Sequence, residues 1–236
     1  MNLALIIAGG RGMRMGQETP KQFLEVNGKP VIAYTLEVFQ RHPDIDAIAV
    51  VCVEGWKSVL TECAEKYGIT KLRHIIPGGE NGQSSIRNGV FALEALYAPS
   101  DIVLVHDAVR PLLSEAIITG CIDTARARGS AIVVVPCQEA MLETTDQISS
   151  ASAYPRDQLK RTQTPQALPL GRLARLHREA LDRGITNSVS TCTMLVELGR
   201  TVYFCPGSEK NLKVTTPDDL DIFRALLATE ERKHHC

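Results

Sequence analysis

The sequence predicts an α/β protein in which helices cover both faces of a mostly parallel sheet. Three observations predict this. Strand-like apolar runs alternate with segments of helical periodicity along most of the chain. Several of these runs are continuously apolar, as strands buried on both faces are. One polar stretch interrupts the alternation, which indicates a part of the chain that leaves the sheet.

The elements can be assigned in chain order from their periodicity. Strand-like runs occupy residues 3–8, 47–53, 73–76, 101–105, 130–135 and 201–204. Helical patterns occupy residues 30–41, 54–67, 84–96, 114–128, 170–183 and 190–199, and a last helix starts at about Pro217. Ser84 or Ser85 is expected near the N-cap of the third helix, because a serine oxygen accepts hydrogen bonds from free N–H groups there.

Residues 136–166 are polar, rich in turn signals and short of apolar periodicity. An unstructured loop of that length is uncommon inside a compact domain, so a β-arm that projects from the sheet is the better prediction. We expect residues 137–163 to form this arm and to dock on a partner chain. The whole chain, residues 1–236, is then one domain with one excursion.

Composition excludes several classes of function. Lys and Arg number 26 and Asp and Glu 27, so no global basic field is present to hold nucleic acid. The seven cysteines are scattered without a CxxC pair, which favours reduced thiols over a disulfide framework or a zinc site. No apolar stretch approaches the roughly 20 residues that a membrane helix needs, and the N-terminus lacks a signal peptide. We therefore expect a cytoplasmic protein without a membrane partner.

A glycine-rich turn, with Gly9, Gly10 and Gly12, follows the first strand. Glycines let backbone N–H groups approach an anion closely, and nucleotide phosphates bind at such turns. The P-loop pattern GxxxxGK[ST] is absent, and Met15 stands where a dinucleotide fingerprint needs its third glycine. A nucleoside triphosphate neutralised by Arg14 and Lys21 remains, beside the alternative of a tight turn with solvated arginines.

The stretch "AGGRGMRMGQETPKQFLEVNGKPV" resembles the N-terminal signature of sugar nucleotidyltransferases. More narrowly, it resembles the cytidylyltransferases that act on 2-C-methyl-D-erythritol 4-phosphate or D-ribitol 5-phosphate. The stretches "PGGENGQSSIRNGV", "VLVHDAVRPLL", "RTQTPQ" and "NLKVTTPDDL" follow in the family's order and spacing. Five such motifs across most of the chain make the resemblance specific.

The resemblance implies a Rossmann-like fold and transfer of CMP from CTP to a polyol phosphate, with pyrophosphate leaving. Such transfer brings two anions together, so positioning and positive charge carry the catalysis. The family assigns the principal catalytic roles to the residues matching Arg14 and Lys21. Asp107 would contact Mg²⁺ and substrate, and the alternative for it is a structural pair with Arg110. We interpret His106 as structural, because an acceptor phosphate needs no general base.

The resemblance also implies the binding residues. Those matching the family's nucleotide site are Ala8, Gly9, Gly10, Gly12, Gly78, Gly79, Gly82 and Ser85. Well-known members carry arginine at the position of Gly82, which leaves the preference for CTP open. The acceptor would be held by Asp107, Arg156, Thr164, Ser190 and Lys213. Arg156 would come from the arm of the neighbouring subunit, so a homodimer is implied.

Two departures from the family pattern fall on the acceptor side. Methylerythritol enzymes usually carry threonine at Ala140 and aspartate at Ser190, ribitol enzymes generally keep them too, and both are missing here. The start "AGGRGMRMG" is closer to the ribitol-type AGG-x-G-x-RMG. D-ribitol 5-phosphate is therefore favoured, with 2-C-methyl-D-erythritol 4-phosphate as the alternative. A nucleotide-binding protein without activity and a nicotinamide-dependent oxidoreductase are the rivals from other classes.

Overall fold

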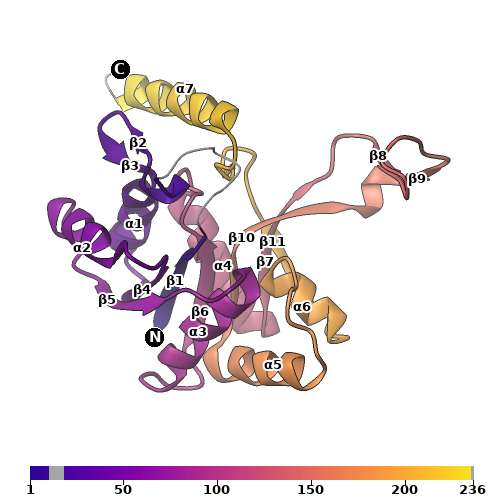
Figure 1. The fold of residues 1–236 in the computed structure, drawn as a ribbon, viewed down its shortest axis with the longest axis horizontal. Helices are drawn as coiled ribbons and strands as arrows, with labels where there is room; N and C mark the ends of the chain where they lie inside the picture. Colours follow the sequence, from indigo (N-terminus) through magenta and orange to yellow (C-terminus); the bar gives the residue numbers. More distant parts are fainter. Residues whose placement is uncertain (11–18, 235–236) are drawn as a thin grey trace.

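A central seven-stranded sheet organises the molecule, in the order β11-β7-β10-β6-β1-β4-β5 (Figure 1). The computed structural model describes residues 1–10 and 19–234. The strands of the sheet are β1 (Asn2–Ala8), β4 (Ala47–Cys52), β5 (Leu72–Pro77), β6 (Ile102–Asp107), β7 (Ala131–Pro136), β10 (Lys160–Pro169) and β11 (Phe204–Pro206). β10 runs antiparallel to both neighbours and the other pairs are parallel. The predicted α/β class and the mostly parallel sheet are confirmed.

Helices cover both faces of the sheet because each buried strand presents apolar side chains on both sides. In β1, Ala4 and Ile6 enter one core cluster and Leu3 and Leu5 enter another. The first cluster contains side chains of α1 (Val31–Arg41), α2 (Lys57–Lys66) and α4 (Glu115–Arg128). The second contains side chains of α3 (Gly82–Glu94), α5 (Leu170–Asp182) and α6 (Thr191–Glu197).

Strand β10 is the main departure from the expected elements. It begins at Lys160, within the range predicted as arm, and pairs with β7 and β6 in the main sheet. The structure also adds a 3₁₀ turn over residues 21–23 and a short hairpin over residues 25–30, neither of which was predicted. Other differences are at element ends. The edge strand expected at residues 201–204 lies at Phe204–Pro206, and the helix expected from residue 54 starts at Lys57.

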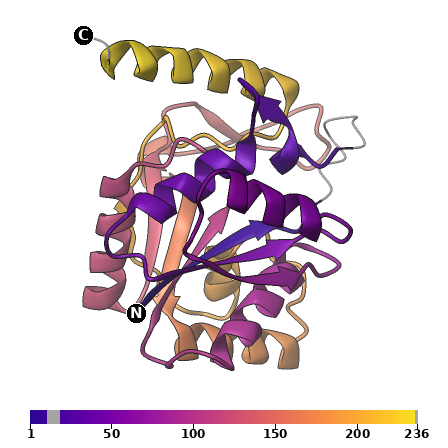
Figure 2. The same cartoon turned by 90° about the vertical axis from the view of Figure 1, so that its left-hand side faces the viewer.

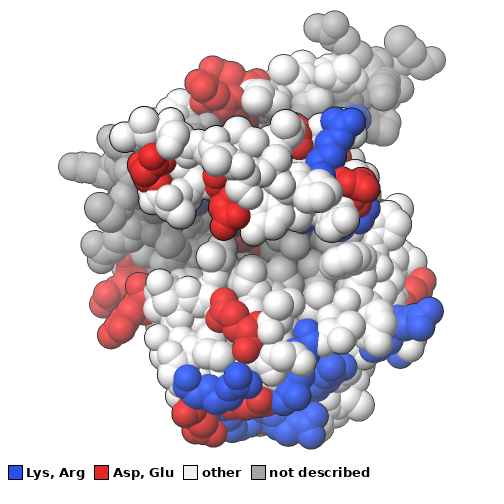
Figure 3. Space-filling view, turned by 90° about the vertical axis from the view of Figure 1, so that its right-hand side faces the viewer, with Lys and Arg blue, Asp and Glu red and all other residues white. Residues whose placement is uncertain are grey.

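The arm itself projects from the ends of β7 and β10 (Figure 1). It carries the hairpin β8 (Met141–Glu143) and β9 (Ser152–Tyr154) and one 3₁₀ turn, η3 (Arg156–Gln158). Four of its large apolar side chains are exposed: Met141, Leu142, Ile148 and Tyr154. Viewed from the side of the arm, lysine and arginine side chains gather toward the bottom, and scattered acidic patches lie above them (Figure 3).

The C-terminal helix α7 (Pro217–His234) lies at the opposite end of the molecule from the N-terminus (Figure 2). Its Phe223 packs in a small cluster with Val26 and Val214. Val26 belongs to the hairpin of β2 (Glu25–Val26) and β3 (Lys29–Pro30), which follows the 3₁₀ turn η2 (Lys21–Phe23). Across residues 1–10 and 19–234, none of the helices is long and apolar enough to cross a bilayer.

The central strands end side by side. Ile7 near the end of β1 is the register partner of Asp107, the last residue of β6. In parallel α/β sheets, ligands bind outside the carboxyl ends of strands, where the chain order reverses around the first strand. The fold thus brings the glycine-rich turn and the "HDAVRP" loop to one edge.

Candidate active site

A cavity of about 370 Å³ opens at this edge of the sheet. Eight of the residues predicted for the site line it: Ala8, Gly10, Lys21, Gly82, Asp107, Thr164, Ser190 and Lys213. They come from β1, η2, α3, β6, β10, the residue before α6 and the segment before α7. Residues distant in the sequence therefore meet around one space, as a two-substrate site requires.

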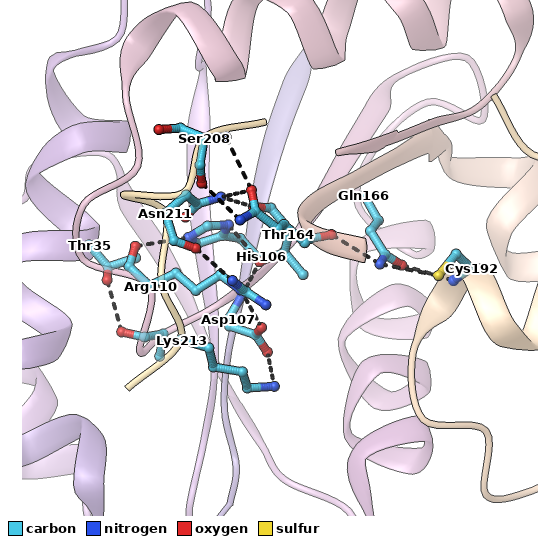
Figure 4. A network of polar contacts seen from close by, with 12 residues as sticks. Thr35, His106, Asp107, Arg110, Thr164, Gln166, Cys192, Ser208, Asn211 and Lys213 are labelled. Carbon is cyan, nitrogen blue, oxygen red and sulfur yellow. Dashed lines mark hydrogen bonds and ion pairs between the residues drawn. The ribbon is translucent and has the colours of Figure 1, made fainter. Parts of the chain in front are cut away.

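Asp107 is held between two cations (Figure 4). Its Oδ2 accepts a hydrogen bond from Arg110 Nε at 3.0 Å, and its Oδ1 lies 3.1 Å from Lys213 Nζ. Burial raises the pKa of this carboxyl, but Lys213 and Arg110 outweigh burial and hold the pKa at about 2. The pair with Arg110 that the sequence left as an alternative is present, and Lys213 joins it.

His106 and Thr164 fix the backbone next to this carboxylate. The Thr164 hydroxyl lies 2.9 Å from His106 Nδ1 and accepts from the Asp107 N–H at 3.1 Å. His106 Nε2 faces the Arg110 carbonyl at 3.4 Å, so the neutral ring donates at Nε2 and accepts at Nδ1. Burial lowers the pKa of His106 to about 3. This geometry fits the structural role expected for the histidine.

The segment that carries Lys213 is anchored by Asn211, which is fully buried. The Asn211 side chain donates to the Thr164 carbonyl at 2.8 Å and to Gln163 Oε1 at 3.2 Å. The main-chain carbonyl of Asn211 accepts from Arg110 Nη1 at 2.7 Å (Figure 4). One asparagine thus ties the Lys213 segment to both β10 and the loop after β6.

Lys21 is positioned by its neighbour Gln22, which is buried. The Gln22 amide donates to the Ala8 carbonyl at 2.7 Å and to the Gly10 carbonyl at 3.1 Å. This pins η2, and the lysine on it, against the glycine-rich turn.

The loops after β1 and β5 approach each other closely, and glycines allow this. A Cβ added at Gly9 would lie 2.9 Å from the Ser85 Oγ, and one at Gly78 would lie 3.3 Å from the Gly9 Cα. The Ser85 hydroxyl accepts from the Gly79 N–H at 3.0 Å. Gly9, Gly78, Gly79 and Ser85 therefore shape the wall behind the cavity and do not line it.

The N-cap of α3 is Asn81, three residues before the serine expected there. Its Oδ1 accepts from the Ser84 N–H at 2.8 Å, and the Ser84 hydroxyl accepts from the Asn81 N–H at 2.9 Å. This reciprocal capping box satisfies two free donors of the first turn.

Hydroxyl side chains from residues 190–193 form a further part of the cavity wall, the hydroxyl wall. Ser190 caps α6 by accepting from the Thr193 N–H at 3.3 Å. Gln166 of β10 anchors the same turn, since its Oε1 accepts from the Cys192 N–H at 2.8 Å (Figure 4). The Thr191 hydroxyl is buried and, within the described part of the chain, makes no hydrogen bond.

Some predicted residues do not join this set. Gly12 and Arg14 lie outside the described residues. Arg156 lies on the arm, where it donates to the Gln138 carbonyl at 3.0 Å, and it does not line the cavity of its own chain. Ala140 is exposed at the start of the arm.

A family model described as "IspD: 2-C-methyl-D-erythritol 4-phosphate cytidylyltransferase" matches residues 2–229. The chain belongs to this cytidylyltransferase family. A ribitol-5-phosphate cytidylyltransferase from Lacticaseibacillus paracasei is 41% identical, over 98% of this chain and 100% of that protein. A 2-C-methyl-D-erythritol 4-phosphate cytidylyltransferase from Syntrophotalea carbinolica is 38% identical, over 95% of each.

Among solved structures, 4-diphosphocytidyl-2C-methyl-D-erythritol synthase from Anaerococcus prevotii has a TM-score of 0.82 and 25% identity, covering 97% of this chain and 96% of that one. The recognised family and its fold are therefore confirmed. Membership makes the protein an enzyme of the nucleotidyltransferase class.

Among the described residues that line it, the cytidylyltransferase cavity offers one carboxylate to a metal. Asp107 is the acidic residue among those lining it, and the described residues contain no cluster of three or more ligating side chains. One carboxylate fits Mg²⁺ that is held mainly by substrate phosphates. The assignment of Asp107 to the metal stays a prediction.

Four residues of the cytidylyltransferase site were not singled out from the sequence as site residues: Gln22, Gln83, Gln166 and Asn211. Their amides bond main-chain groups, and such bonds leave no periodic signal. All four do occur inside the quoted motifs. Gln22 and Gln83 stand directly beside the predicted residues Lys21 and Gly82, and that adjacency was the available sign.

Proposed function

We propose that this protein transfers the cytidylyl group of CTP to D-ribitol 5-phosphate, giving CDP-ribitol. A phosphate oxygen of the acceptor attacks the α-phosphorus of CTP, the α–β phosphoanhydride bond breaks, and pyrophosphate leaves. The observation that carries this proposal is the convergence of Lys21, Arg110 and Lys213 around one cavity at the carboxyl ends of β1 and β6. Two anionic substrates need such charge to meet.

The chain's own residues divide the work between the two substrates. Gly10 presents backbone to the triphosphate, and Lys21 with Arg14 supplies charge where it grows on the α-phosphate and the leaving group. Lys213 and Arg110 take the acceptor phosphate. Mg²⁺ carried by the triphosphate would neutralise further charge, with Asp107 as its protein ligand.

The choice of acceptor rests on the hydroxyl wall and on similarity. Ser190 and Thr193 place neutral hydroxyls on the cavity, which suits a polyol chain. Relatives named for ribitol 5-phosphate are up to 41% identical, against 38% for one named for methylerythritol phosphate. The family description names 2-C-methyl-D-erythritol 4-phosphate, which stands as the second candidate.

The test is pyrophosphate release from CTP and Mg²⁺, with ribitol 5-phosphate, methylerythritol 4-phosphate and glycerol 3-phosphate compared as acceptors. We expect kcat/KM to be highest for ribitol 5-phosphate by at least about tenfold, the worth of roughly one buried hydrogen bond. A preference for methylerythritol phosphate would reverse the acceptor assignment. Folded protein that binds CTP but turns over none of the three would contradict it.

The arm is part of the same proposal: a homodimer in which Arg156 completes the neighbour's site. Supporting it are the exposed apolar side chains of the arm and the fact that Arg156 does not line the cavity of its own chain. Mixed subunits carrying Lys21→Ala and Arg156→Ala should regain activity through hybrid dimers. No recovery in subunits shown to exchange would count against the shared site. The cytoplasmic location and the absence of a nucleic-acid partner stay predictions.

A further inference from the structure

A short segment without helix or strand, residues 185–190, joins α5 to the hydroxyl wall of the cavity. It ends in Val189 and Ser190, which line the cavity together with Gly82. Half of its six residues are exposed, so packing alone does not fix its position. The Ile185 N–H donates to the Ala180 carbonyl at 2.8 Å and the Ser188 hydroxyl donates to Glu197 at 2.6 Å. The other bonds that hold the segment come from side chains that bond its backbone.

Gln83 makes two of those bonds. Its side chain is 4% exposed. Its Nε2 donates to the Ile185 carbonyl at 2.7 Å, and its Oε1 accepts from the Ser188 N–H at 2.7 Å. Both polar atoms of the buried Gln83 amide therefore form hydrogen bonds with this segment, at two residues that are three positions apart.

Gln83 stands at the second position of α3, directly after the cavity-lining Gly82. The same turn therefore contributes to the lining of the cavity and holds the segment that carries Val189 and Ser190. A weaker second contact assists it, since Asn81 Nδ2 donates to the Thr186 carbonyl at 3.1 Å.

We propose that Gln83 is a positioning residue that sets the acceptor-facing wall at Ser190 relative to the nucleotide-facing turn at Gly82. This inference rests on the proposed function, because it takes the cavity as the place where CTP and the polyol phosphate meet. It assigns to the chain a specificity element that acts through backbone placement.

The nucleotide side has its own supports. The capping box between Asn81 and Ser84 and the bond from the Gly79 N–H to Ser85 do not involve Gln83. Loss of the Gln83 amide should therefore move the Ser190 side and leave the CTP side in place. The expected signature is an effect on the acceptor KM that is separate from CTP affinity.

The test compares Gln83→Leu and Gln83→Glu with wild type, using CTP, Mg²⁺ and ribitol 5-phosphate. Gln83→Leu removes both bonds at similar volume, and we expect the acceptor KM to rise about tenfold while the Kd for CTP stays within about twofold. Gln83→Glu keeps an acceptor for the Ser188 N–H, so an intermediate KM is expected. Equal rises in the acceptor KM and in the Kd for CTP, or no change in either constant, would overturn the proposal.

Gln40→Leu is the matched control. Gln40 of α1 also bonds a loop backbone, accepting from the Lys71 N–H at 2.8 Å, but it does not line the cavity. Its loss should leave both constants unchanged. Combining Gln83→Leu with Ser190→Ala tests whether Gln83 acts through Ser190. The double variant should then be little worse than the poorer single variant, whereas additive effects would contradict the mechanism.

Hydrogen exchange tests the clamp without turnover. The peptide covering residues 185–190 should exchange faster in Gln83→Leu, by about tenfold at the Ser188 amide, and should not change in Gln40→Leu. Unchanged exchange would refute the clamp. A wild-type enzyme that is inactive with every polyol phosphate would instead refute the proposed function, and the exchange result would still decide the role of Gln83.

Discussion

His177 makes the stability of this protein dependent on pH. It lies in α5, is 1% exposed, and neither ring nitrogen has a hydrogen-bond partner among the described residues. Its ring meets the edge of Phe91 at a centroid distance of 6.5 Å. Burial, with a smaller contribution from Arg87, lowers the pKa of His177 from 6.5 to about 4. The folded state therefore keeps this histidine neutral.

The direction of this pH dependence follows from the protons that the folded and unfolded chains bind. Between pH 6.5 and 4 the unfolded chain protonates His177 and the folded chain does not, so the free energy of unfolding falls as pH falls. The loss of stability caused by His177 begins as the pH falls below about 6.5 and is complete below the folded pKa of about 4. At about 1.36 kcal/mol for each pH unit, the total loss from this residue is about 3 kcal/mol, of which about 2.5 kcal/mol is reached by pH 4.5.

Urea unfolding of wild type and His177→Leu from pH 7.5 to 4.5 measures this loss in the free energy of unfolding. Leucine suits the surrounding apolar cluster, so at pH 7.5 the two proteins should differ by less than about 1 kcal/mol. At pH 4.5 the variant should gain about 2.5 kcal/mol relative to wild type. His106 and the carboxylates titrate in both proteins and cancel in the difference. A difference that stays constant across the range would refute the reasoning.

Three substitutions test other parts of the structure. Lys21→Ala should abolish pyrophosphate release while leaving the urea midpoint unchanged, and an active variant would contradict its catalytic role. Gln22→Leu leaves the Gly10 carbonyl without its side-chain donor, so we expect about 1–2 kcal/mol of destabilisation and a kcat at least about tenfold lower. A loss of stability with an unchanged kcat would show that Gln22 does not position Lys21 for catalysis. Gly89→Ala places a Cβ 2.7–2.9 Å from side chains of β1 and β4. It should lower the free energy of unfolding, measured in urea, by about 1–3 kcal/mol. An unchanged free energy of unfolding would show that α3 can shift to make room.

Much of the fold was predictable because its signals are local and repeated. Continuous apolar runs such as 47–53 and 101–105 identify strands buried on both faces, and their alternation with helical patterns identifies a parallel sheet. The glycine-rich turn after β1 and Asp107 at the end of β6 identified the edge that carries the site. Their place directly after strand-like runs suggested these residues, and the family resemblance assigned their roles, so neither step needed coordinates.

Strand β10 escaped prediction for a physical reason. Its first residues, Lys160, Arg161 and Thr162, are exposed, and Pro165 interrupts the strand pattern. What makes it a strand is pairing on both sides, with β7 and β6, and that pairing is invisible in its own composition. Tertiary pairing therefore overrode a weak local signal.

The sequence by itself determined the layers of the fold, the end of the sheet that carries the site, and the charged residues placed there. Only the tertiary structure decided which of them meet: Asp107 contacts Lys213 across 106 positions of the chain, and Gln83 reaches Ser188 across 105. The physical reason is that charge and side-chain amides act over a few ångströms of space and impose no period on the sequence, whereas the burial of helices and strands does.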